Sequence, residues 1–146
     1  MIDQLIEFTG NNLLLVTALL ISAALLIQNL LADNKGNLNP VQATEMINHE
    51  DAVVIDVRPA ADFSKGHIIN AINVPATNLQ NQMNQLQKYK DKTVIVSCRS
   101  GAQSSVVRKQ LIKEGFEKVF NLKGGILNWQ ADNLPVSTKS PKANKK

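Results

Sequence analysis

The sequence contains few of the residue types from which metal and redox sites are built. Cys98 is the single cysteine among 146 residues, and His49 and His67 are the two histidines. A single cysteine can form neither an internal disulfide nor a CxxC redox pair. Two isolated histidines supply too few ligands for a zinc site. We therefore predict no metal site and no redox-active disulfide, and Cys98 is left as the candidate reactive thiol.

An excess of basic charge is also missing from the body of the chain. The net charge is +4 at pH 7, and four lysines among the last eight residues account for it: Lys139, Lys142, Lys145 and Lys146. The other twelve basic residues balance the twelve acidic ones. Basic and aromatic residues are not interleaved as they are on nucleic-acid-binding surfaces. We predict no nucleic-acid partner, and we expect residues 137–146 to form a disordered basic tail.

Charged residues of either sign are absent from Phe8 to Ala32. A helix over the last twenty of these residues would be about 30 Å long, which matches the hydrocarbon core of a bilayer. A cleaved signal peptide would begin with basic residues, whereas Asp3 and Glu7, and no basic residue, precede this segment. We predict that residues 1–32 are a retained anchor, with a span at about residues 11–32 that contacts membrane lipid.

The flanks of this segment also predict its orientation. The first basic residue is Lys35, which follows the predicted span. The positive-inside rule then favours a short outer N-terminus and a cytoplasmic C-terminal domain. An unpaired cysteine suits the same reducing compartment. We predict a single-pass protein of the cell inner membrane whose C-terminal domain faces the cytoplasm.

The remainder of the chain alternates between predicted strands and helices. Residues 33–39 are expected to be a linker and residues 40–136 a folded domain. Apolar runs predict strands at residues 53–57, 71–74, 93–97 and 118–122, and helical spacing predicts helices at about residues 40–48 and 77–89, after Cys98 and around Trp129. This alternation predicts an α/β fold with a mainly parallel sheet. Such sheets bind ligands beyond the carboxyl ends of their strands, where Cys98 falls.

The cysteine lies in a short polar loop between an apolar strand and a helix. Ser104 and Ser105 are candidate N-caps for that helix. The free N–H groups at a helix start favour negative charge, so a thiol held there should ionise easily and act as a nucleophile. The alternative is a small buried hydrophobic residue, as lone cysteines often are.

Several linked motifs resemble the rhodanese homology domain. They are Asp56-Val57-Arg58 with Asp62-Phe63, Gly66-His67-Ile68, Ala71-Ile72-Asn73-Val74-Pro75, the Cys98 loop, Gly115-Phe116, and Gly124-Gly125 followed by Trp129. The resemblance covers about residues 40–136. It implies a rhodanese-like parallel sheet with helices on both faces, preceded here by one transmembrane helix. It also implies sulfurtransferase activity, with Cys98 as the nucleophile.

The chemistry follows from a thiolate and a sulfane donor. The thiolate of Cys98 attacks the outer sulfur of a small donor such as thiosulfate, sulfite leaves, and the cysteine carries a persulfide. An acceptor thiol or cyanide then removes the terminal sulfur, in a relative of thiol–disulfide exchange. No organic cofactor is required. The binding loop that we predict consists of Arg99, Ser100, Gly101, Ala102, Gln103 and Ser104.

Each neighbour of the cysteine has a functional and a structural interpretation. Arg99 either guides an anionic donor or is a solvated loop charge. Ser100 and Ser104 either donate to the persulfide or cap the turn. Gln103 stands where many loops of the family carry a second arginine, which weakens the case for a thiosulfate preference.

The supporting residues that precede the loop are Asp56, Arg58 and Asp62. Arg58 is expected to pair with Asp62, and Asp56 is expected to be structural. His67 is expected to pack or to bind the backbone. Asn70 is expected to accept a left-handed backbone. In the first helix, the inward candidates are Val41, Thr44 and Ile47.

Two other functions compete with sulfur transfer as explanations of the Cys98 loop. A cysteine phosphatase needs an arginine six positions after the cysteine to clamp the phosphoryl oxygens, and Ser104 stands there. That function is therefore disfavoured. A membrane-tethered binding or sulfur-carrier module, with a membrane protein as its partner and little turnover of its own, stays open. Tethering would raise the local concentration of such a partner.

Overall fold

The computed structural model describes residues 1–139, apart from the side chains of residues 5, 6 and 32–34. The chain divides into two compact units, Met1–Lys35 and Gly36–Lys146. The predicted disordered tail lies mostly outside the described residues. Its first residues are ordered, because Ser137 belongs to a short strand.

The first unit consists of two helices, α1 (Ile2–Asn11) and α2 (Leu13–Asn34). Within α2, the segment Leu13–Leu31 has a mean hydropathy of 2.2 and none of it is buried. Thr17 and Ser22 return their hydroxyl protons to backbone carbonyls of the same helix. The helix is therefore long and apolar enough to cross a membrane, as the sequence predicts.

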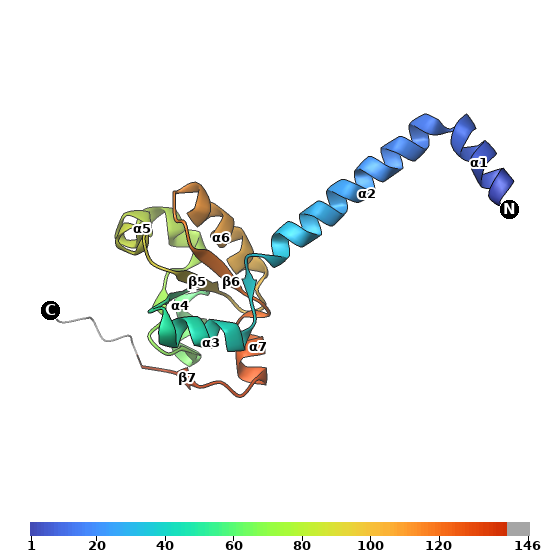
Figure 1. Ribbon diagram of the computed structural model, residues 1–146. Helices are drawn as coiled ribbons and strands as arrows, with labels where there is room; N and C mark the ends of the chain where they lie inside the picture. Colours follow the sequence, from blue (N-terminus) through green and yellow to red (C-terminus); the bar gives the residue numbers. More distant parts are fainter. Residues whose placement is uncertain (140–146) are drawn as a thin grey trace. The chain divides into compact units, whose positions relative to one another are not determined.

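The second unit is built on a five-stranded parallel sheet (Figure 1). Its strands, in spatial order, are β1 (Asn37–Leu38), β6 (Val119–Leu122), β5 (Val94–Ser97), β2 (Val53–Asp56) and β4 (Ile72–Asn73). The predicted α/β fold with a mainly parallel sheet is confirmed. Cys98 follows the middle strand, so it lies at the carboxyl edge of the sheet with a strand on either side.

Two strand pairings were not predicted from the sequence. Asn37 and Leu38, which we assigned to the linker, form β1 and pair with β6. Strands β3 (His67–Ile68) and β7 (Val136–Ser137) pair antiparallel outside the main sheet. These three unpredicted strands, unlike β4, lie in no apolar or alternating run, so sequence periodicity cannot identify them.

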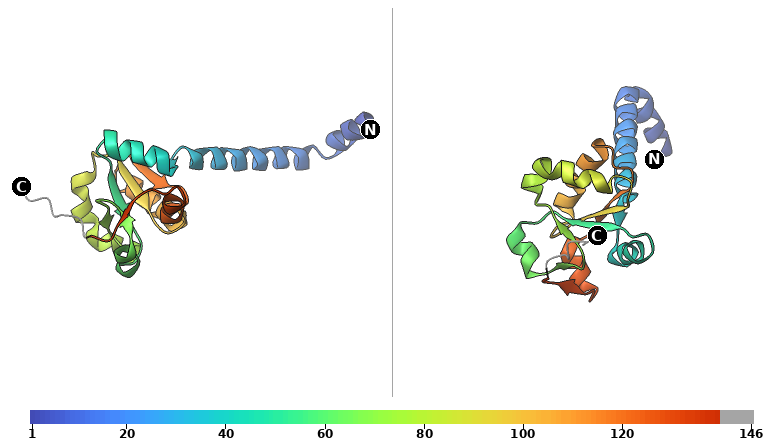
Figure 2. Two further views of the ribbon diagram at one scale, coloured as in Figure 1. Left: turned by 90° about the horizontal axis from the view of Figure 1, so that it is seen from below. Right: turned by 90° about the vertical axis from the view of Figure 1, so that its left-hand side faces the viewer.

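Helices cover both faces of the sheet (Figures 1 and 2). The helices are α3 (Pro40–His49), α4 (Ala60–Lys65), α5 (Leu79–Leu86), α6 (Ala102–Lys113) and α7 (Gly125–Ala131). Helices α5 and α6 pack in one hydrophobic cluster, and α3, α4 and α7 pack in the other. Side chains of β5 alternate between the clusters: Val94 and Val96 join the first and Ile95 the second.

Two predicted helices differ in detail from the observed ones. The segment at residues 77–89 is one α-helix, α5, between two 3₁₀ turns, η1 (Ala76–Asn78) and η2 (Gln87–Tyr89).

Helix α3 begins with a capping box, in which the side chains of Asn39 and Gln42 each accept a hydrogen bond from the backbone N–H of the other residue. Val41 was predicted to face inward, but it is 66% exposed. Ala43 is fully buried in its place, because it lies three residues from the buried Pro40 on the same helical face.

Candidate functional site

The loop after β5 is shorter than the sequence analysis predicts. Helix α6 begins at Ala102, and Gly101 is its N-cap, with a left-handed φ of 93°. The predicted caps, Ser104 and Ser105, therefore lie inside the helix. Glycine takes a positive φ at little cost, and this lets the helix begin about three residues earlier than a serine cap would. The early start brings the first N–H groups of the helix to the cysteine.

The sulfur of Cys98 lies within a ring of hydrogen-bond donors. The N–H of Gly101 lies 3.1 Å from Sγ, the N–H of Ser104 lies 3.4 Å away, and the hydroxyl of Ser104 lies 3.2 Å away. The cysteine is 2% exposed. None of the other loop side chains donates to Sγ among the contacts of the described residues.

These contacts make Cys98 more acidic than an ordinary thiol. Burial alone would raise the pKa of Cys98. The hydroxyl of Ser104, followed by the backbone N–H groups of Ser104, Gly101 and Ser100, outweighs burial and lowers the pKa. Each donor favours the charged form of the sulfur. The thiol is therefore suited to react as a thiolate.

A second loop supports the first from the adjacent strand. Gly124 and Gly125 follow β6, and helix α7 begins at Gly125. The N–H of Ile126 donates to the carbonyl of Cys98 at 2.9 Å, and the N–H of Leu127 donates to the carbonyl of Arg99 at 3.2 Å. Gly125 has a φ of 58°, and a Cβ there would collide with both of those carbonyl oxygens. Glycine at position 125 therefore allows the start of α7 to lie close enough to donate hydrogen bonds to the backbone of the cysteine loop.

Ser104 links the sulfur to a buried amide that the sequence analysis did not identify. Ser104 is fully buried, and its hydroxyl donates to Oδ1 of Asn121 at 2.6 Å. Asn121 in turn donates to Oδ1 of Asn37 at 2.7 Å. Asn121 is 5% exposed and lies in β6, an otherwise apolar strand. A single polar residue in a buried strand was the signal that could have identified it.

The remaining side chains of the predicted loop make no hydrogen bond to the sulfur among the described residues. Arg99, Ser100, Ala102 and Gln103 are exposed. Ser100 acts on the thiol through its backbone N–H. The side chain of Arg99 makes no hydrogen bond or ion pair with any residue that the structure describes.

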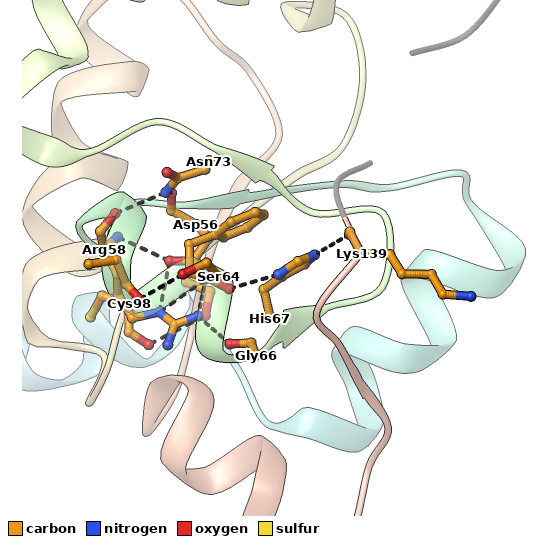
Figure 3. Close-up of polar contacts among 11 residues, drawn as sticks. Asp56, Arg58, Ser64, Gly66, His67, Asn73, Cys98 and Lys139 are labelled. Atoms are coloured by element: carbon orange, nitrogen blue, oxygen red, sulfur yellow. Dashed lines mark hydrogen bonds and ion pairs between the residues drawn. The ribbon is translucent and has the colours of Figure 1, made fainter. Parts of the chain in front are cut away.

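Arg58 does not pair with Asp62, contrary to the sequence analysis. Its guanidinium binds both carboxylate oxygens of Asp56, with an Nη2–Oδ2 distance of 2.6 Å, and also donates to the carbonyl of Gly66 at 2.8 Å (Figure 3). Asp62 pairs instead with Lys65 at 3.4 Å. Arg58 and Asp56 are both buried at the end of β2, whereas the side chain of Asp62 in α4 is about half exposed. A buried guanidinium takes the carboxylate that is buried with it.

His67 has the structural role that we predicted. Its ring stacks on Phe63, with the ring centroids 3.7 Å apart. Nδ1 lies 2.8 Å from the carbonyl of Phe63, and Nε2 lies 3.0 Å from the carbonyl of Lys139 (Figure 3). His67 therefore connects the end of the described chain to β3, and no contact between it and the sulfur is recorded among the described residues.

The predicted left-handed backbone of Asn70 is also confirmed, with a φ of 63°.

An open cleft of about 290 Å³ adjoins the cysteine loop. The side chains of Arg58, Lys65 and Arg99 line it together with a single carboxylate, Asp62. Ile126 and other residues of α7 complete the lining. Arg58 is neutralised by Asp56 and Lys65 is paired with Asp62, so Arg99 is the lining cation without an ion-pair partner among the described residues. Its free guanidinium favours an anionic ligand at this end of the cleft.

The chain is similar to several known proteins. The family model of the Rhodanese-like domain matches residues 39–132. The uncharacterized protein YibN of Escherichia coli strain K12 is 39% identical over 141 residues, which cover 92% of this chain and 96% of that protein. The thiosulfate sulfurtransferase GlpE of Glaesserella parasuis is 33% identical over 99 residues, which cover 68% of this chain and 90% of that protein.

A solved structure has the same architecture. The crystal structure of a rhodanese-related protein from Thermoplasma volcanium matches with a TM-score of 0.64 and 28% sequence identity. The match covers 70% of this chain and 98% of that one.

Proposed function

Since the chain belongs to the Rhodanese-like domain family, we propose that it is a membrane-anchored sulfurtransferase that works through a persulfide on Cys98. It moves sulfane sulfur from a donor such as thiosulfate to a thiol or cyanide acceptor. The observation that carries this proposal is the ring of N–H and O–H donors around the sulfur of the only cysteine.

The first half-reaction forms the persulfide. The thiolate Sγ attacks the outer sulfur of thiosulfate, and a new S–S bond forms. The bond between the outer sulfur and the sulfite sulfur breaks, and its electron pair leaves with sulfite. The negative charge then lies on the terminal sulfur of the persulfide. Successive backbone N–H groups of the loop stabilise that anion without a cation.

The second half-reaction regenerates the thiolate. An acceptor thiolate or cyanide attacks the terminal sulfur, and the bond between that sulfur and Sγ breaks. The electron pair returns to Sγ, which the Gly101 and Ser104 N–H groups and the Ser104 hydroxyl stabilise. The same donors that activate the nucleophile therefore improve the leaving group. Electrons balance within each half-reaction, so neither one needs an electron carrier.

The cleft beside Arg99 provides the approach for the donor. Arg99 is exposed at its wall and adjoins Cys98, so its guanidinium is available to an incoming anion. Gln103 is exposed and neutral at the position of the second arginine of many family loops. Fewer fixed cations mean weaker selection for a doubly charged inorganic donor. Thiosulfate is accordingly one donor of this protein rather than a strongly preferred one.

Helix α2 would hold the domain at a membrane. Its hydropathy and length suit a bilayer, and Lys35 follows it directly. The proposed location is the cell inner membrane, with one span, lipid around α2 and the rhodanese-like domain in the cytoplasm. Its substrates are small sulfur donors and thiol or cyanide acceptors, and a membrane protein is its candidate macromolecular partner. Nucleic acid is not among its proposed partners.

One observation favours the alternative of a sulfur carrier with little turnover. Cys98 is 2% exposed, so a persulfide there would be shielded from most solutes. Such a persulfide would pass its sulfur to a partner that docks on the loop. The two functions share the persulfide and differ in the rate at which small acceptors remove it.

The test uses the full-length chain in detergent. Incubation with thiosulfate should add the mass of one sulfur atom to the peptide that contains Cys98. Added cyanide or thiol should then remove it, at a rate that separates an enzyme from a carrier. The Cys98→Ser variant should show neither adduct nor turnover. Turnover that survives this substitution would rule out the proposed nucleophile.

A further inference from the structure

The hydroxyl of Ser104 has two acceptors and one proton. Oγ lies 3.2 Å from Sγ of Cys98 and 2.6 Å from Oδ1 of Asn121. A hydroxyl donates a single hydrogen bond, so it can serve only one of the two at a time. All three residues are buried: Ser104 is 0% exposed, Cys98 2% and Asn121 5%. In such a site water does not readily replace a lost partner.

The amide of Asn121 is held in the orientation that presents an acceptor to Ser104. Its Nδ2 donates to Oδ1 of Asn37 at 2.7 Å, across the pairing of β1 with β6. Its backbone N–H donates to the carbonyl of Gly36 at 2.8 Å, which fixes the strand that carries it. Oδ1 of Asn121 therefore faces the hydroxyl as a fixed acceptor.

We propose that Asn121 is a positioning residue that competes with the sulfur of Cys98 for the single proton of the Ser104 hydroxyl. While the sulfur is neutral, the hydroxyl donates to Asn121. When the sulfur is a thiolate, the hydroxyl turns to it and Oδ1 of Asn121 loses its donor. Ionisation of the thiol therefore has a cost that the backbone N–H groups alone would not impose.

This competition has a consequence for sulfur transfer, which rests on the proposed function. Forming the persulfide moves the negative charge from Sγ to the terminal sulfur, and Sγ becomes a neutral, two-bonded sulfur. The hydroxyl is then free to return to Asn121. Asn121 thus favours the persulfide over the free thiolate, and it opposes the return of charge to Sγ when the acceptor takes the sulfur.

The test compares thiolate formation in full-length variants, without any sulfur donor. The probe is the ultraviolet absorbance of the thiolate of the single cysteine, followed against pH in detergent and corrected with Cys98→Ala. Asn121→Leu removes the acceptor and keeps the branched shape and the number of heavy atoms of the side chain. It should lower the pKa of Cys98 and raise the thiolate fraction about three- to ten-fold at a pH below the midpoint. Asn121→Ala should act in the same direction if the leucine variant does not fold.

The Ser104→Ala variant supplies the control for mechanism. Alone, it should raise the pKa of Cys98, because the sulfur loses a donor. Combined with Asn121→Leu, it should leave the thiol as it is in Ser104→Ala, since Asn121 acts through the hydroxyl. A raised or unchanged pKa in Asn121→Leu, or an equal shift of the pKa with and without the hydroxyl, would overturn the proposal. Loss of sulfurtransferase activity does not enter this test, so failure of the proposed function is recognised separately.

Discussion

Adding one methyl group at Gly125 should displace the cysteine loop. The residue has a φ of 58°, where a side chain is strained by about 1–2 kcal/mol. A Cβ there would also collide with the carbonyl oxygens of Cys98 and Arg99. Those oxygens accept the N–H groups of Ile126 and Leu127, and each such bond contributes about 0.5–1.5 kcal/mol. Gly125→Ala should therefore lower the free energy of unfolding by about 2–5 kcal/mol.

Gly125→Ala should also raise the pH at which Cys98 is alkylated. A matched variant at Gly115 shows how much of the stability loss comes from backbone strain alone. Gly115 has a φ of 90°, but a Cβ there would meet only the flexible end of the Lys90 side chain. Gly115→Ala should cost about 1–2 kcal/mol and leave the pH profile of Cys98 alkylation unchanged. Gly125→Ala should shift that profile to higher pH, because a displaced loop no longer aims its N–H groups at Sγ. Equal stability losses and identical alkylation profiles would refute the supporting role assigned to the Gly124-Gly125 turn.

Three further predictions test the ion pair, the thiolate and the cleft. Asp56→Asn should destabilise the fold by about 3–5 kcal/mol in a denaturant titration, because it leaves the buried Arg58 without a full counter-charge. In the same titration, Asp62→Asn should change stability by less than about 0.5 kcal/mol. The folded pKa of Cys98 lies below its ordinary value of 9.0, so the unfolded chain binds more protons between the two. Stability relative to Cys98→Ser should therefore rise with pH through that window and lose this gain as pH falls through the folded pKa. A flat difference between the two proteins would contradict the assigned pKa. Arg99→Ala should raise the KM for thiosulfate about two- to five-fold with kcat little changed, and added salt should reduce the difference between the two proteins. An unchanged KM at low salt would show that Arg99 does not contact the donor.

The central features of the fold and the loop could be predicted from local sequence. The apolar run before Cys98 predicts β5, and its position predicts that Cys98 lies at the carboxyl edge of the sheet, where the structure places it. Asn70 was expected to accept a left-handed backbone, and its φ of 63° confirms this. These features depend on interactions between residues that are close in the chain, and the local residue types and their spacing are enough to predict them.

The features that sequence reasoning missed depend on contacts across the fold. Arg58 has two carboxylates within four positions, and only burial decides between Asp56 and Asp62. The start of α6 depends on the left-handed backbone of Gly101, which packs against the turn after β6. Asn121 reaches Ser104 only because β6 lies beside β5. No local pattern in the sequence encodes these distances.

The most direct test of the account is a pH titration of Cys98 in the folded chain and in the same chain unfolded in denaturant. The donors around Sγ predict that the folded thiol ionises at the lower pH of the two. A folded thiol that ionises at the same pH as the unfolded one, or at a higher pH, would contradict the claim that this loop stabilises a sulfur anion.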